Sequence, residues 1–198
     1  MNFTSTLLFG EEASEESIKS LSGNSPKILH FATHGYVIST LPQLENNSFV
    51  TSIRGLNEKD TYMLWSGLLL TGGNNTWRGE TLPDRVEDGI LTAEEISRLD
   101  LSNTELVVLS ACDTGRGHID PVEGVWGLQR AFKEAGVKTI LMTLWKVPDN
   151  TTAMFMTEFY RNLIEGDSVR GSVKKAQQYL IDNGASDPYY WAPFVVLD

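Results

Sequence analysis

The sequence predicts an α/β domain with a mostly parallel sheet, and three observations support this fold class. Residues 106–109 form an unbroken apolar run with two adjacent valines, which is typical of a strand buried on both faces. Residues 137–145 form a second apolar run, and an amphipathic helical pattern separates the two. Strands that alternate with helices in this way are typical of parallel sheets. A length of 198 residues fits one domain with a full core.

The first half of the chain predicts short elements separated by polar loops. The expected elements are a strand over residues 3–10, a helix over 14–21, strands over 27–35 and 64–71, and a helix over 92–99. The expected loops cover residues 36–54 and 72–88. The last helix is the best defined, because Thr92 and Glu95 have the spacing of a capping box.

The second half predicts longer helices. After the strand at residues 106–109 and a loop over 115–120, the expected elements are a helix over 123–135, a strand over 137–145, helices over 149–165 and 168–184, and a strand over 190–197. The helix over 123–135 has one apolar face, and Gly136 follows it in the position of a C-terminal cap. Trp145 lies at the end of an apolar run and is expected in the core.

Composition and charge exclude several classes of function. The formal net charge of −10 disfavours binding to nucleic acid or to an anionic membrane, since both need a basic patch. No apolar run approaches the length of a membrane span, and the N-terminal residues lack the pattern of a signal peptide. A single cysteine cannot form an internal disulfide, which fits a reducing compartment. We therefore expect a cytoplasmic protein with no nucleic-acid or membrane partner.

That single cysteine, Cys112, comes three residues after the buried run, where the chain changes to small and turn-forming residues. It is expected at the carboxyl end of a central parallel strand, where open α/β sheets place their ligand crevices. A free cysteine can also be an inert, buried apolar residue. The position of Cys112 beyond the core part of its strand favours a reactive thiol over that alternative.

His34 ends the apolar stretch over residues 27–35 and is followed by Gly35. If the two strands lie parallel in one sheet, His34 and Cys112 emerge at the same edge. A cysteine nucleophile needs a neighbouring base or cation, and histidine supplies one at neutral pH. The alternative for His34 is a core histidine bonded to the backbone. His30 lies four residues earlier, but this spacing forms a metal pair only on a helix, so we expect neither a metal ion nor another cofactor.

Several motifs in order resemble those of the CHAT domain, a caspase-like cysteine peptidase family related to separase. They are the segments at residues 30–35, 106–114, 123–128, 144–149, 159–166, 176–177 and 190–194. The resemblance implies a three-layer caspase-like sandwich, with a mostly parallel central sheet flanked by helices, over residues 1–198. It implies that the most N-terminal strands of the family are missing and that a helical-repeat domain precedes the chain in a longer protein.

The resemblance also implies roles for site residues. Cys112 and His34 would be catalytic, and the backbone N–H groups of Gly35 and Cys112 would hold the oxyanion. Asp149 matches the separase aspartate that lines the primary specificity pocket, which would select Arg or Lys. Asp149 could instead be the N-cap of the helix that follows it.

Asp113 and Glu123 are two further candidates for substrate binding. Asp113 could also be a turn carboxylate, and Glu123 a favourable charge in the first turn of a helix. The residues and the resemblance together predict a cysteine endopeptidase that acts on proteins or peptides, and the resemblance implies cleavage after a basic residue. The alternative is a CHAT module that binds partner proteins and cleaves slowly or not at all.

Overall fold

A computed structural model describes residues 4–37, 63–64, 66–78, 87–110 and 121–198, with only the backbone at Val37, Trp77 and 121–126. Its central sheet has the strand order β1-β5-β6-β7. The four strands are β1 (Ile28–Phe31), β5 (Leu106–Leu109), β6 (Thr139–Thr143) and β7 (Phe194–Leu197). The pairs β1–β5 and β5–β6 are parallel, whereas β7 pairs antiparallel to β6. The prediction of a mostly parallel sheet is confirmed.

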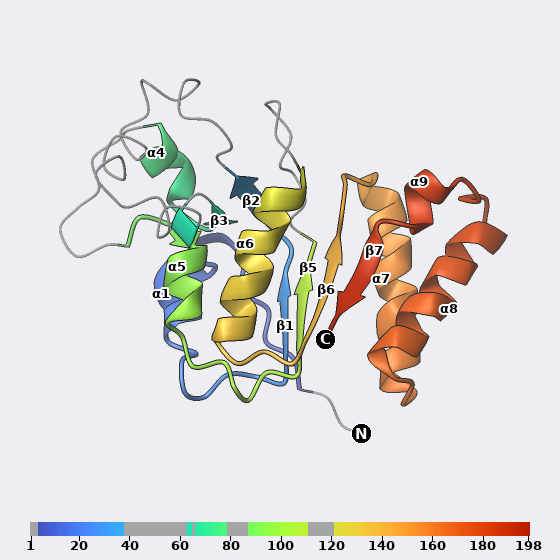
Figure 1. Ribbon diagram of the computed structural model, residues 1–198, viewed down its shortest axis with the longest axis horizontal. Helices are drawn as coiled ribbons and strands as arrows, with labels where there is room; N and C mark the ends of the chain where they lie inside the picture. The colour runs from blue at the N-terminus through green and yellow to red at the C-terminus, as the bar shows by residue number, and fades with distance from the viewer. Residues whose placement is uncertain (1–3, 38–62, 65, 79–86, 111–120) are drawn as a thin grey trace.

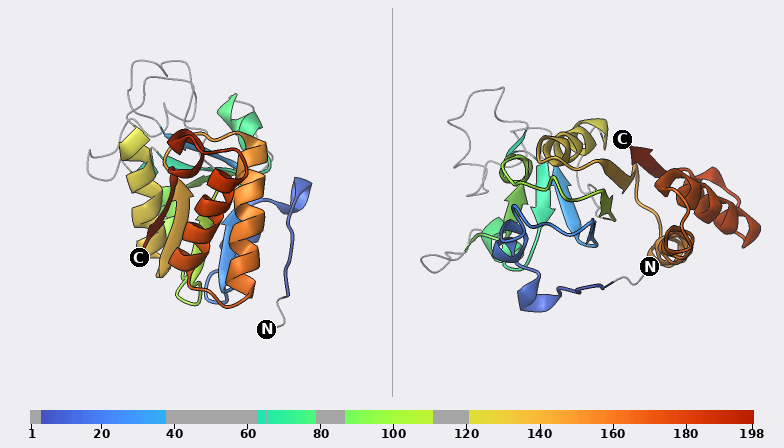
Figure 2. Two further views of the ribbon diagram at one scale, coloured as in Figure 1. Left: turned by 90° about the vertical axis from the view of Figure 1, so that its right-hand side faces the viewer. Right: turned by 90° about the horizontal axis from the view of Figure 1, so that it is seen from below.

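Helices cover both faces of this sheet, so the predicted three-layer sandwich is confirmed (Figures 1 and 2). Successive side chains of a strand point to opposite faces. Val107 and Leu109 therefore pack in one core, and Leu106 and Val108 in the other. The first core is shared with α1 (Glu15–Lys19), α5 (Ala93–Ser97) and α6 (Pro121–Glu134), and the second with α7 (Asp149–Ile164) and α8 (Val169–Asp182).

A second sheet lies beside the first and was not predicted. It contains β2 (His34–Val37), β3 (Ser66–Leu69) and β4 (Ile90–Thr92) in that order, with both pairs antiparallel. The expected single strand over residues 27–35 is wrong, because the chain leaves the central sheet after Phe31. The Thr33 hydroxyl donates a hydrogen bond to the Leu69 carbonyl oxygen, which ties the departing chain to β3. His34 consequently begins a strand of the second sheet.

The helix boundaries follow their caps. The Thr92 hydroxyl accepts from the Glu95 N–H, and the Glu95 side chain accepts from the Thr92 N–H, so the capping box is confirmed. Ser14 and Ser168 are the N-caps of α1 and α8, and each side chain accepts a hydrogen bond from a backbone N–H of the first turn. Gly136 has φ +96° and lies two residues beyond the end of α6 at Glu134. A residue with a Cβ atom is strained there, which explains the glycine.

Three short elements correct the predictions. Residues 4–9 form no strand, and η1 (Gly10–Glu12) follows them. The expected loop over 72–88 contains α4 (Gly73–Trp77), and the start of the predicted last strand is α9 (Pro188–Trp191). The first two residues of the expected loop over 36–54 belong to β2 instead. The rest of that loop, residues 79–86 and the loop over 115–120 lie outside the described residues. Within the described part of the chain, no helix is long and apolar enough to cross a membrane.

Gly67 allows the close approach of β2, β3 and β4. A Cβ atom there would lie 2.5 Å from the Leu91 carbonyl oxygen and 2.7 Å from the Tyr36 ring. The first contact is with backbone and cannot be relieved by a rotamer change. We expect Gly67→Ala to lower the free energy of unfolding by about 1–3 kcal/mol in urea titrations. An unchanged midpoint would contradict this packing.

Candidate functional site

The strands that precede His34 and Cys112 in the sequence are paired with each other. In the parallel β1–β5 pair, Phe31 lies opposite Leu109, and the Ser110 N–H donates to the Phe31 carbonyl oxygen at 2.9 Å. His34 is three residues beyond Phe31, and Cys112 is three residues beyond Leu109. The strands β1 and β5, which precede His34 and Cys112 in the sequence, therefore end at the same edge of the sheet.

His34 is exposed, whereas Gly35 and Tyr36, which follow it in β2, are buried or nearly so. The exposed position argues against the alternative of a buried core histidine. In the described part of the second sheet, β2 is an edge strand. Every second backbone N–H of an edge strand points away from the partner strand. Gly35 thus lies in a strand that presents N–H groups outside the ladder.

Two of the predicted site residues, Cys112 and Asp113, lie outside the described residues. The backbone of Glu123 lies in the first turn of α6, but its side chain is not described. Their predicted roles therefore stay predictions.

Asp149 is the first residue of α7, and the N-cap of that helix is Pro148, which offers no side-chain cap. The alternative that Asp149 is the N-cap is therefore wrong. The Asp149 side chain is exposed and forms no hydrogen bond or ion pair with the described residues. It follows β6, whose carboxyl end lies at the same edge as that of β5 (Figure 1). A carboxylate is thus presented to solvent at the edge of the sheet where β5 and β6 end.

The loop between β6 and α7, which precedes Asp149, is held in place by aromatic residues. The Trp145 indole N–H donates to the Tyr189 carbonyl oxygen at 2.9 Å, and the Tyr189 hydroxyl donates to the Lys146 carbonyl oxygen at 2.8 Å. These two hydrogen bonds fix the β6–α7 loop against α9. Trp145 is 38% exposed, so its expected place in the core is wrong. Trp145 lies two residues beyond the end of β6 at Thr143, whereas the sequence predicted a strand that continued through it.

Comparison with known proteins decides the family. The family profile described as the CHAT domain matches residues 2–197. The chain belongs to the CHAT domain family. This match confirms the predicted resemblance.

Two curated relatives cover the same region. The CHAT domain described here is 30% identical over 215 residues to tetratricopeptide repeat protein 28 of Mus musculus and 28% identical over 197 residues to the protein of the same name from Homo sapiens. The alignments include 93% and 96% of this chain. They span only 8% of either relative, so the matched region is a small part of each.

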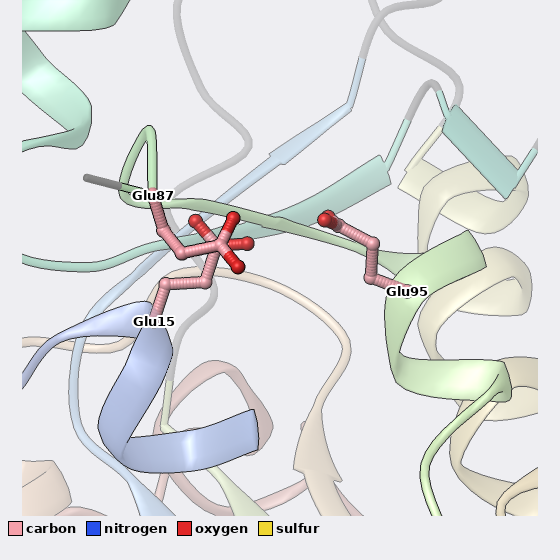
Figure 3. A group of neighbouring side chains, drawn as sticks. All are labelled: Glu15, Glu87 and Glu95. Carbon is pink, nitrogen blue, oxygen red and sulfur yellow. The ribbon is translucent and has the colours of Figure 1, made fainter. Parts of the chain in front are cut away.

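A cluster of charges in this CHAT domain was not predicted. Glu15, Glu87 and Glu95 come from three separate segments, and their carboxylates point toward one another (Figure 3). Their ligand-type oxygen atoms lie within 4.8 Å of one another, as in sites that hold a cation. The Lys19 ammonium lies 2.6, 3.1 and 2.9 Å from these three carboxylates and supplies the positive charge. Only the Glu15–Lys19 spacing of four residues is visible in the sequence.

Glu15 is the buried member of this cluster, with 1% of its surface exposed. Its second carboxylate oxygen accepts from the Gly89 N–H at 3.0 Å. Burial raises the pKa of Glu15 to about 7, although its hydrogen bond with Lys19 acts in the opposite direction. Burial also disfavours the charged form of Lys19, but hydrogen bonds to the three glutamates outweigh it and raise the pKa of Lys19.

The raised pKa of Glu15 should make the free energy of unfolding depend on pH. Between pH 4.5 and 7 the folded state binds the Glu15 carboxyl proton more tightly than the unfolded state does. The contribution of Glu15 to the free energy of unfolding therefore falls as pH rises. We expect Glu15→Gln to become more stable relative to the wild type between pH 5 and pH 8, by about 3 kcal/mol at most. Urea titrations at both pH values test this. A difference in unfolding free energy that is independent of pH would contradict it.

Proposed function

We propose that this CHAT domain is a cysteine endopeptidase with Cys112 as nucleophile and His34 as its acid–base partner. The Cys112 thiolate attacks the carbonyl carbon of the scissile peptide bond, and a carbon–sulfur bond forms. When the carbon–nitrogen bond breaks, protonated His34 gives its proton to the leaving amine. Water then attacks the thioester, which releases the acid product and regenerates the thiol. No metal ion or cofactor takes part in these steps.

The negative oxygen of the tetrahedral intermediate needs hydrogen-bond donors. We assign this role to the backbone N–H groups of Gly35 and Cys112, as the family resemblance implies. Each such donor is worth about 3 kcal/mol to a transition state of this kind.

Asp149 is the proposed determinant of specificity. It is exposed, makes no bond with described residues and lies at the edge of the sheet where β5 and β6 end. A carboxylate in this position would accept charge-assisted hydrogen bonds from an Arg or Lys side chain of the substrate. Asp113 and Glu123 are proposed to line the same site, where their negative charge would also favour a basic peptide.

The parallel β1–β5 register is the observation that carries the proposal. His34 and Cys112 are each three residues beyond the paired positions Phe31 and Leu109. Neighbouring parallel strands deliver their carboxyl ends to one edge of the sheet, which is where α/β proteins place their reactive groups.

The first test is hydrolysis of fluorogenic peptides by the chain, using peptides that carry Arg or Lys before the reporter. Cys112→Ala is the control for a contaminating peptidase. Hydrolysis that requires Cys112 supports the proposal, whereas equal rates for the wild type and Cys112→Ala would contradict it.

A second candidate function is favoured by the names of the relatives. Both are named as tetratricopeptide repeat proteins. By analogy, this domain would follow a helical-repeat domain in a longer chain and would bind partner proteins with little or no cleavage. If the wild type and Cys112→Ala capture a protein partner equally well, and the wild type hydrolyses no peptide, this second function is favoured. Either function fits a reducing, cytoplasmic setting, in which the thiol stays free.

A further inference from the structure

His30 lies on the face of β1 that is opposite to the α5–α6 core. Its neighbours Leu29 and Phe31 point into that core, so the alternation of the strand directs His30 toward α7. There the His30 Nε2 atom lies 2.8 Å from the Ser110 Oγ atom, and Nδ1 lies 3.0 Å from the Tyr160 Oη atom. His30 therefore links the end of β5 to α7 through both of its ring nitrogens.

Both ring nitrogens of His30 have a hydrogen-bond partner, although the His30 side chain is exposed. Desolvation lowers the pKa of His30, and burial raises the pKa of Tyr160 to about 12. A neutral imidazole has one donor and one acceptor nitrogen, and each hydroxyl can take either role. Both ring nitrogens are thus satisfied in either tautomer.

Both partners of His30 are held by other contacts. The Tyr160 ring packs edge-on against Phe159, with the ring centres 5.1 Å apart, and Phe159 is fully buried. Ser110 is bonded through its N–H to the Phe31 carbonyl oxygen at 2.9 Å. Ser110 is also the last described residue before the segment that contains Cys112, two positions further on.

We propose that His30 is a positioning residue, which fixes Ser110 against α7 and so sets the direction in which the chain leaves β5 toward Cys112. This inference rests on the proposed function, because it assigns His30 a role in the geometry of the Cys112–His34 pair. Buried β1 positions such as Leu29 and Phe31 fill the core, whereas the histidine contributes two directed hydrogen bonds.

The test exploits the single cysteine of the chain. Alkylation by iodoacetamide, followed by intact-mass spectrometry, reports on Cys112 alone. It measures the reactivity of the thiol whether or not any peptide is cleaved. The variants are Tyr160→Phe, which removes one hydroxyl, His30→Phe, which removes both nitrogens, and His30→Gln, which retains a donor for Ser110. Tyr179→Phe, on the partly exposed face of α8, is the matched control.

We expect Tyr160→Phe and His30→Phe to lower kcat by about 10- to 100-fold with little change in KM, because small displacements of a reacting group have effects of this size. Alkylation at pH 7 should slow several-fold in the same variants, recover in part in His30→Gln and stay unchanged in Tyr179→Phe. In a His34→Ala background, the His30 substitutions should have no further effect on alkylation.

The two proposals can fail separately. If the wild type hydrolyses no peptide but its alkylation depends on His30 and Tyr160 as described, the positioning role stands and the peptidase assignment fails. If folded Tyr160→Phe and His30→Phe proteins keep the wild-type kcat and alkylation rate, the positioning role is overturned and the peptidase assignment is unaffected. Slowing in His30→Phe without slowing in Tyr160→Phe would also overturn the role, because the link to α7 requires both residues.

Discussion

Cys112→Ala and His34→Ala are each expected to lower kcat/KM for a basic peptide by at least about 10³-fold, because each removes a group that forms or breaks a bond in the reaction. The double variant should be no slower than the slower single variant, since the two residues act as one unit. The measurement is the initial rate of fluorogenic peptide hydrolysis across a range of substrate concentrations.

Stability measurements accompany these rates. His34 is exposed, so its removal leaves no cavity in the core, and the urea midpoint of His34→Ala should stay close to that of the wild type. Loss of stability with unchanged hydrolysis by either variant would show that the residue is structural and would refute its catalytic role.

The second large effect concerns specificity. Asp149→Ala should lower kcat/KM about 10- to 100-fold for substrates with Arg or Lys before the scissile bond, which corresponds to the loss of a charge-assisted hydrogen bond worth about 1.5–3 kcal/mol. The rate for a peptide with a neutral residue at that position should change little. Asp149→Asn should lose the same preference, and Asp149→Glu should retain part of it because it keeps the charge.

The competing explanation of Asp149 is a charge in the first turn of α7. In that case Asp149→Ala would lower stability by about 0.3–1 kcal/mol and leave the ranking of substrates unchanged. Profiling a peptide library with the wild type and Asp149→Ala separates the two explanations. A wild-type preference for an acidic residue before the scissile bond would refute the pocket assignment.

Much of the fold could be predicted because local signals and burial agree. The run at residues 106–109 is apolar at every position, and all four residues are buried between two helical layers. The capping box at Thr92 and Glu95 and the glycine at position 136 mark helix ends through backbone chemistry that a sequence displays directly.

The second sheet could not be predicted, because it depends on a change of direction after Phe31. Residues 27–35 alternate too weakly to show where one strand ends and another begins, and the hydrogen bond from Thr33 to Leu69 joins residues far apart in the sequence. The cluster around Lys19 was missed for a similar reason. Three carboxylates meet there only because α1, the residues before β4 and α5 are packed together.

For the site, the sequence predicted an edge of the sheet but not the contacts between the residues near it. The expected convergence of His34 and Cys112 assumed one common sheet. The strands that precede them, β1 and β5, are paired in parallel, but His34 itself begins β2, and the convergence stays a prediction. The link from His30 to Ser110 and Tyr160 spans three elements, and no spacing in the sequence indicates it.

The most direct test of Cys112 as a peptidase nucleophile is covalent labelling of the chain by a peptidyl acyloxymethyl ketone that ends in arginine. The adduct is then detected by intact-mass spectrometry. Because the chain has one cysteine, any thioether adduct identifies its site. We expect one adduct per chain, none in Cys112→Ala, and a rate at least about 10²-fold lower in His34→Ala and in urea-unfolded protein. Labelling of the folded wild type no faster than that of the unfolded chain would contradict a reactive Cys112 and, with it, the peptidase function.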